Sequence, residues 1–295
     1  MSDTGERRAV KQWWADNPMT YGATHGQTTY SSTDGTAATV ELGTRQFFER
    51  VDETFYNWNR PLHANGVPFA RMFPYESYRN SRVLEVGCGM GTMAMNWAKQ
   101  GALITPCDLN PVAVTQTSNR LKAFELTRTV VQADGGSLPF SSESFDYVYS
   151  WGVLHHSPRL EDSIAELFRV LKPGGGYGVM LYNRKSLRYR YLVELIEGLL
   201  HGESKFLAPT ELASRYADAS AEEGNPHTWP VTRDEMRQLF QGFSGAVTVD
   251  IFGDKELRNT LKLMLPFVWR IVPDVVLRTW ATSFGWSVWI HGVKN

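Results

Sequence analysis

Three closely spaced glycines follow a short apolar segment near residue 85. The stretch reads Val83-Leu84-Glu85-Val86-Gly87-Cys88-Gly89-Met90-Gly91-Thr92. A buried strand that runs into such a loop and then into a helix lets the backbone approach a ligand at the carboxyl end of a parallel sheet. The NAD fingerprint requires Gly or Ala where Thr92 stands, and no P-loop Gly-Lys-Ser/Thr follows. The loop alone therefore indicates a nucleotide-like ligand without identifying it.

Short apolar runs alternate with helical periodicity from Arg82 onward, which is typical of βαβ units. We expect strands at residues 83–86, 103–107, 129–132, 145–150, 177–181, 247–252 and 286–293. The sequence KPGGG at 172–176 is expected to be the stop that follows the helix of 160–171. These patterns predict an α/β fold: a Rossmann-like, doubly wound, seven-stranded and mostly parallel sheet with an aromatic-rich N-terminal segment and C-terminal helical insertions.

Charge and composition narrow the class of protein. Lys and Arg number 30 against 31 for Asp and Glu, so no basic surplus indicates a nucleic-acid partner, and a small molecule is expected instead. No stretch reaches the roughly 20 apolar residues that span a bilayer. The two cysteines, Cys88 and Cys107, suit a reducing compartment, and we expect a cytoplasmic protein. No metal site is expected, because neither CxxC nor HExxH occurs.

A carboxylate, Asp108, stands at the end of the second expected strand, where it could accept hydrogen bonds from ribose hydroxyls. A helix cap before Asn110-Pro111 is the alternative role. The chain then carries four motifs in order: VLEVGCGMG, the acid in CDLNP, ADGGSLPFSSESFDYVYSWGVLHHS and ELFRVLKPGGGYGVMLY. With these motifs it resembles the class I S-adenosylmethionine (SAM)-dependent methyltransferases, specifically the type 11 branch.

The resemblance implies a common role, binding SAM, for residues of several loops. They are Glu85, Gly87, Cys88, Gly89, Gly91, Asp108, Leu109, Asp134, Gly135, Ser150, Trp151 and Trp14. Asp108 would hold the ribose, Asp134 the adenine amino group and Glu85 the methionine amino group. Acid-rich loops suit a cationic sulfonium better than a pyrophosphate. SAM is the expected cofactor, with S-adenosylhomocysteine as its product.

The same resemblance divides the chain into two parts. Residues 1–80 would form an aromatic-rich lid or cap, and 81–295 the SAM-binding methyltransferase domain, with substrate-covering insertions at about 184–230 and 254–283. The segment KQWWADNPMTYG resembles a lid in some family members, in which Trp14, Tyr21 and His25 would close over SAM and exclude water. Packing in the core is the alternative role for the tryptophans.

The nature of the methyl acceptor decides whether a base is needed. Oxygen acceptors usually need one, and His155 and His156 after the fourth strand are candidate bases, together with Tyr21 and His25 of the lid. A structural role at a helix start is the alternative for the histidine pair. We expect transfer to an oxygen of a natural product or sugar-like metabolite. The alternatives are N- or C-methylation, a SAM-binding protein without transfer, and an NAD-dependent oxidoreductase.

Apolar side chains recur between Leu257 and Trp280, where Pro266 and Pro273 interrupt any membrane span. Burial against the sheet is the expected role of this insertion. Weak interfacial contact with a lipid-linked substrate is the alternative, because five apolar residues lie close together: Leu261, Met264, Leu265, Phe267 and Val268. The sequence does not indicate an oligomeric state.

Overall fold

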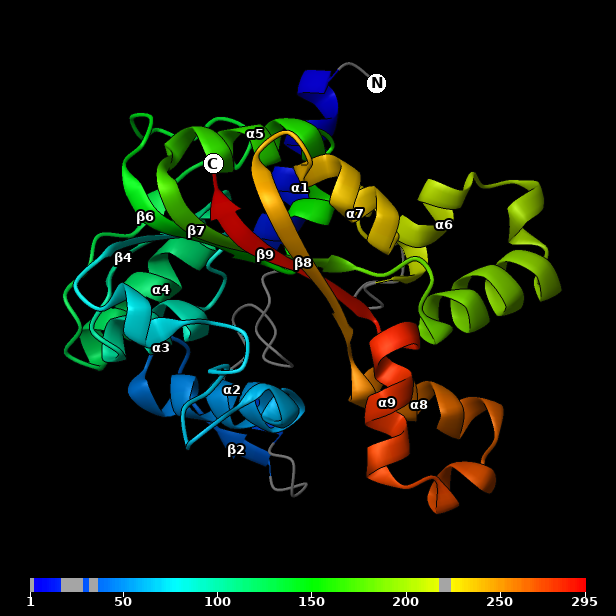
Figure 1. Ribbon diagram of the computed structural model, residues 1–295. Coiled ribbons are helices and arrows are strands. Elements are labelled where there is room, and N and C mark those ends of the chain that lie inside the picture. The colour runs from blue at the N-terminus through cyan, green and yellow to red at the C-terminus, as the bar shows by residue number, and fades with distance from the viewer. Residues whose placement is uncertain (1–2, 17–28, 32–36, 218–223) are drawn as a thin grey trace. The chain divides into compact units, whose positions relative to one another are not determined.

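The computed structural model describes residues 3–16, 29–31, 37–217 and 224–295 (Figure 1). Seven strands form a sheet in the order β5-β4-β3-β6-β7-β9-β8. These are β3 (Arg82–Val86), β4 (Leu103–Asp108), β5 (Val131–Gln132), β6 (Phe145–Trp151), β7 (Leu171–Tyr182), β8 (Ser244–Phe252) and β9 (Ser287–Lys294). β3 pairs in parallel with β4 and β6, whereas β9 runs antiparallel to β7 and β8. The expected seven-stranded α/β fold is confirmed.

Local capping signals explain where several helices begin. Helix α4 (Pro111–Ala123) follows β4, and the Asn110 side chain caps it by accepting from the Val112 amide. Helix α7 (Arg233–Phe240) begins at Thr232, which forms a reciprocal capping box with Glu235. Helices α3 (Thr92–Lys99) and α5 (Leu160–Val170) follow β3 and β6. Within the helices that the structure describes, none is long and apolar enough to cross a membrane.

The chain forms two compact units, each built from several segments. The first unit comprises residues 11–149 and 166–175, and the second comprises residues 1–10, 150–165 and 176–295. The remaining elements are α1 (Asp3–Asp16), β1 (Thr29–Ser31), β2 (Ala37–Thr39), α2 (Arg45–Trp58), η1 (Arg60–Leu62), η2 (Tyr75–Tyr78), η3 (Leu154–His156), the π-helix η4 (Tyr189–Leu200), η5 (Glu203–Lys205), α6 (Pro209–Tyr216), α8 (Asp254–Met264), η6 (Val268–Ile271) and α9 (Asp274–Phe284).

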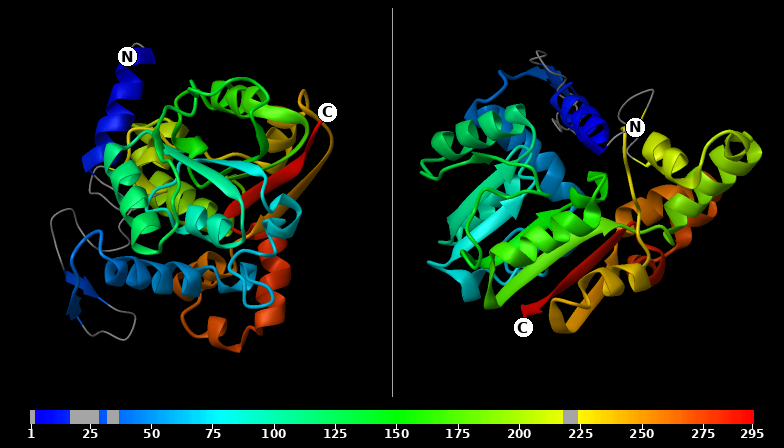
Figure 2. Two further views of the ribbon diagram at one scale, coloured as in Figure 1. Left: turned by 90° about the vertical axis from the view of Figure 1, so that its left-hand side faces the viewer. Right: turned by 90° about the horizontal axis from the view of Figure 1, so that it is seen from above.

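In the first unit, helix α2 is amphipathic and lies alongside α3 and α4, as the left view of Figure 2 shows. Phe47, Phe48 and Val51 on its apolar face pack with Met90 of the glycine loop. Within α3, the fully buried Trp97 contacts aromatic rings of η2 and β6. The glycine loop is thus packed against α2, and the helix that follows it is packed against η2 and β6.

In the second unit, β8 and β9 are neighbours in the sheet but not in the chain. Helices α8 and α9 are inserted between them and extend from the strand ends (Figure 1). The pairing of β8 with β9 extends to Phe252 and Ser287, so the insertion begins and ends at the same end of these two strands. The carboxyl end of β7 lies at this end too, because Tyr182 pairs with the same Ser287.

One local expectation is wrong. The KPGGG sequence at 172–176 lies inside β7, which begins at Leu171, rather than forming the stop before the strand. Lys172 Nζ donates to Asp146 of β6 at 2.6 Å, and the pairing of β7 with β9 begins at Gly176. Gly174, between them, has a φ of 73°, so the start of the strand is irregular. Contacts with the neighbouring strands thus override the low strand propensity of Gly and Pro.

Candidate functional site

The glycine loop after β3 is held against the end of β4. The Gly87 amide donates to the Cys107 carbonyl at 2.8 Å. Gly91 has a φ of 76°, and a Cβ at this position would lie 2.8 Å from Thr117 Oγ1, so only glycine fits. A Cβ on Gly89 would meet no atom within 4 Å. The space beside Gly89 is therefore open to a ligand.

Asp108 faces this loop from the end of β4. Its Oδ2 accepts from the Gly89 amide and its Oδ1 from the Asn110 amide, both at 2.9 Å. Burial raises the pKa of the carboxyl, and the amide hydrogen bonds partly offset that rise. Asn110, not Asp108, caps the following helix. Each carboxylate oxygen has a second lone pair, so the pair can still accept from two hydroxyls.

Glu85 lies on β3 directly before the loop and is 2% exposed. Its Oε2 has no hydrogen-bond partner among the described residues, and burial raises the pKa of the carboxyl well above its usual range. Buried carboxylate oxygens normally have a donor. A positively charged ligand would provide one and would also relieve the cost of ionisation. Asp108 and Glu85 thus fit a cationic ligand such as SAM.

Two further residues that were predicted to bind SAM, Asp134 and Trp14, also belong to the first unit. The Asp134 side chain accepts from the Gly136 amide at 2.8 Å and shapes the turn that contains Gly135. The Trp14 carbonyl accepts from Asn110 Nδ2 at 2.5 Å, which ties the end of α1 to the loop after β4. Tyr21 and His25 lie outside the described residues.

The second unit contains the predicted residues from the end of β6. Ser150 is fully buried, and the Trp151 ring packs against Phe252 and Trp289 at centroid distances of 5.6 and 5.5 Å. This packing places large rings where β6 and β8 end. The set of expected SAM ligands is thus divided between the two units, with ten of the described ones in the first.

The two candidate bases lie on η3, also in the second unit. The His155 ring is fully buried and lies 3.8 Å from the Tyr182 ring. His156 is 5% exposed, and its Nδ1 lies 3.1 Å from the His227 carbonyl oxygen. A carbonyl can only accept, so Nδ1 is the donor, and Nε2 is the ring nitrogen left to take up a proton.

Sequence reasoning missed a buried ion pair that supports the glycine loop. Arg120 of α4 donates from Nη1 to Asp52 Oδ1 and from Nε to the Met90 carbonyl, both at 2.6 Å. Thr92, the first residue of α3, donates to the same Asp52 oxygen at 3.0 Å. One signal could have found this pair: Asp52 is an acid on the apolar face of an amphipathic helix, beside Val51.

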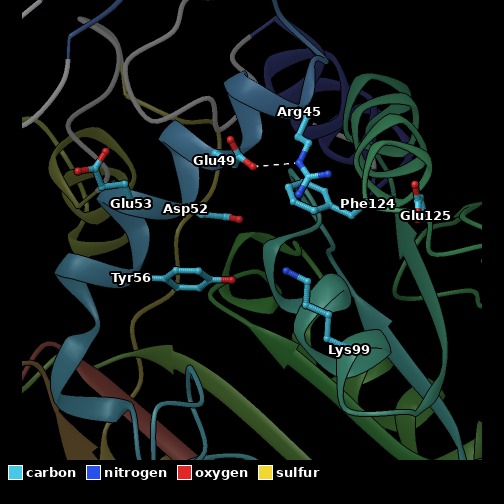
Figure 3. Close-up of a pocket in the computed structure, with 8 residues that line it drawn as sticks. All are labelled: Arg45, Glu49, Asp52, Glu53, Tyr56, Lys99, Phe124 and Glu125. Atoms are coloured by element: carbon cyan, nitrogen blue, oxygen red, sulfur yellow. Dashed lines mark hydrogen bonds and ion pairs between the residues drawn. The ribbon is translucent and has the colours of Figure 1, made fainter.

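Asp52 also lines an open pocket of about 580 Å³ (Figure 3). The other lining residues are Arg45, Glu49, Glu53, Tyr56, Lys99, Phe124 and Glu125. Figure 3 shows the side chains of Asp52, Tyr56 and Lys99 converging on the same space. Because charged groups dominate its lining, this pocket does not fit an apolar ligand.

Comparisons with known proteins agree with the geometry of the loops. Residues 84–178 match the Methyltransf_11 family model, described as a methyltransferase domain. A sterol 24-C-methyltransferase of Gibberella zeae is 31% identical over 240 residues, which are 70% of this chain and 63% of the relative. The chain therefore spans less than two thirds of that relative's length.

Two solved structures share the fold. One, described as a SAM-dependent methyltransferase of Methanosarcina mazei, is 19% identical with a TM-score of 0.51, over 76% of this chain and 98% of that one. The [4+2]-cyclase SpnF is 16% identical with a TM-score of 0.52, over 97% and 96% of the two chains. At this level of identity the likeness concerns the fold. The family match, the motifs and the acidic glycine-loop site together identify residues 84–178 as a class I SAM-dependent methyltransferase domain, whose cofactor is SAM.

Proposed function

We propose that this chain transfers a methyl group from SAM to a carbon atom of an apolar small molecule of the sterol kind. The observation that carries the proposal is the similarity over 240 residues to a sterol 24-C-methyltransferase. An oxygen acceptor, which the sequence motifs favoured, has no support from that relative. A carbon acceptor therefore becomes the first candidate.

Aromatic rings in the second unit support an apolar acceptor. The centres of the Tyr182 ring, at the end of β7, and the Trp286 ring are 4.6 Å apart, and the Trp151 ring packs against Phe252 and Trp289. Trp286 and Trp289 are buried, whereas Tyr182, Trp151 and Phe252 are partly exposed and offer apolar contact area to a sterol-like molecule. Their faces also attract positive charge, which develops on a carbon acceptor as it takes the methyl group.

SAM, when bound, supplies a methyl group on a positively charged sulfur. In the first unit, Asp108 would accept from its ribose hydroxyls, and Glu85 would complement its ammonium group. The electron pair of an acceptor double bond would form the new carbon–carbon bond while the carbon–sulfur bond breaks and S-adenosylhomocysteine leaves. A carbon beside the resulting carbocation would then lose a proton. His156 is our candidate for the group that takes this proton, because its Nε2 is the basic nitrogen of the ring.

A labelled-methyl assay tests the proposal. The purified chain is incubated with SAM carrying a ¹³C methyl group and with either a sterol that has a side-chain double bond or a phenol of similar solubility. We expect the label on a sterol carbon, located by NMR. Transfer to the phenol oxygen, with none to the sterol, would contradict carbon methylation and restore the oxygen acceptor.

A second candidate function is SAM binding without methyl transfer. It is favoured by one observation, the fold shared with a protein described as a [4+2]-cyclase over nearly the whole of both chains. Calorimetry with S-adenosylhomocysteine separates this candidate from a chain with no cofactor site. This candidate would be supported if the chain binds S-adenosylhomocysteine, transfers no label to any acceptor and catalyses the [4+2] cyclisation of a polyene substrate.

A further inference from the structure

The insertion between β8 and β9 is a helical hairpin with a defined inner face. We use the term hairpin for residues 254–284, which comprise α8, η6 and α9. Leu257, Leu277 and Ala281 are buried between the helices, and Leu261 packs against them. At the base, Gly253 has a φ of 122°, and a Cβ there would lie 2.7 Å from the Trp286 amide nitrogen. The hairpin therefore has its own small core and a closely packed base.

Much of the surface of the hairpin is apolar and exposed. The exposed apolar residues are Leu263, Leu265, Phe267, Ile271, Val275, Trp280 and Phe284, of which Phe267 is the most exposed at 83%. They make up seven of the fifteen large apolar side chains that are exposed within the described residues, although the hairpin is about a tenth of the chain. Such a concentration marks a surface that binds a partner.

Basic residues surround the exposed apolar side chains at the tip. Residues 262–273 contain Lys262 and Arg270 and no acid, whereas the whole chain has a net charge of −1. Lys262 Nζ lies 4.6 Å from the centre of the Trp269 ring, and Arg270 Cζ lies 5.9 Å from it. Neither cation forms an ion pair within the part of the chain that the structure describes. Tryptophan with flanking cations is the composition of segments that lie at a membrane interface.

We propose that the tip of this hairpin docks on an anionic lipid surface. Phe267 and Ile271 enter the acyl boundary, while Lys262 and Arg270 remain at the level of the phosphates. A second copy of the chain fits this surface poorly, because a symmetric contact would bring Lys262 and Arg270 of both tips together, and Asp274, the next acid along the chain, already pairs with Arg258. Docking goes beyond methyl transfer and does not depend on it.

The test is vesicle sedimentation with the full chain, in the absence of SAM and of any acceptor. Vesicles of phosphatidylcholine alone are compared with vesicles that also contain phosphatidylserine. We expect binding to the mixed vesicles that weakens as salt is raised. The double variant Phe267→Ser/Ile271→Ser should bind at least about tenfold more weakly, since two apolar side chains no longer leave water. Lys262→Gln/Arg270→Gln should lose roughly tenfold on the mixed vesicles only.

Phe206→Ser is the matched control. This residue is as exposed as Phe267, at 86%, but lies outside the hairpin, so its replacement should leave vesicle binding unchanged. Circular dichroism checks that each variant is folded. Three results would overturn the proposal: no vesicle binding by the unaltered chain, equal loss in Phe206→Ser, or a dimer in solution that only Phe267→Ser/Ile271→Ser dissociates. A chain that binds vesicles but methylates nothing would contradict the proposed function and leave docking intact.

Discussion

Asp108 combines two tasks, because its carboxylate holds two loop amides and is also our proposed ribose ligand. We expect Asp108→Ala to weaken S-adenosylhomocysteine binding by roughly 10- to 100-fold, the effect of losing charge-assisted hydrogen bonds. Titration calorimetry measures the affinity, and thermal unfolding monitors the fold. Unchanged affinity in a folded variant would remove Asp108 from the cofactor site.

Glu85 is a second residue whose burial has a measurable cost. Because the folded chain raises the pKa of this carboxyl, it holds the proton more tightly than the unfolded chain does. Below the ordinary glutamate pKa both states are protonated, and as pH rises above it the folded state loses stability relative to the unfolded state. Glu85→Gln should therefore raise the free energy of unfolding near neutral pH by on the order of 1 kcal/mol, with no gain in acid. Urea unfolding near neutral pH and again below the ordinary glutamate pKa measures the free energy of unfolding. A variant that is less stable than the unaltered chain at neutral pH would contradict the prediction.

His156 can be separated from a structural role by a substitution that keeps one nitrogen. In His156→Asn, the amide can still donate to the His227 carbonyl, but the basic Nε2 is gone. If His156 takes the proton, turnover should fall by about 10²- to 10⁴-fold, while S-adenosylhomocysteine affinity and thermal stability stay near those of the unaltered chain. Loss of stability in step with turnover would assign the residue to packing.

At the scale of elements, the pair of Asp52 and Arg120 joins α2, α4 and the glycine loop. Arg120→Met leaves a buried carboxylate without its partner, and we expect the free energy of unfolding to fall by roughly 3–5 kcal/mol. Arg45→Met is the matched control, because its ion pair with Glu49 is exposed on the same helix and should contribute less than about 1 kcal/mol. Urea unfolding measures both. Similar losses in the two variants would mean that burial does not strengthen this pair.

The same elements show which parts of the fold a sequence can predict. The glycine loop, the Asn110 cap and the Thr232 capping box are local signals, since the interacting residues are at most a few positions apart. Asp52 and Arg120 are 68 residues apart, and no local pattern links them. The prediction for the KPGGG segment is wrong for a related reason, because the conformation of this segment depends on strand pairing in the fold rather than on its own propensities.

At the scale of the whole molecule, the acids proposed to bind SAM and the hairpin come from different stretches of chain. The acids proposed to bind SAM lie between residues 85 and 134, whereas the hairpin occupies 254–284. Phe252 and Ser287 pair in adjacent antiparallel strands. A short turn of Gly and Asn before Trp286 can therefore replace the hairpin together with Gly253 and Gly285. We expect the shortened chain to fold and to bind S-adenosylhomocysteine within about threefold of the full chain, because none of the expected cofactor ligands lies in the removed segment.

Methyl transfer to a sterol in vesicles should fall below detection in this shortened chain, since both the lipid contact and the apolar cover of the acceptor are removed. Repeating the assay with detergent-dispersed sterol separates these two causes. Recovery in detergent would assign the hairpin to docking alone, whereas continued loss would assign it to acceptor binding as well. Loss of S-adenosylhomocysteine binding in a folded, shortened chain would contradict the division between cofactor and acceptor segments.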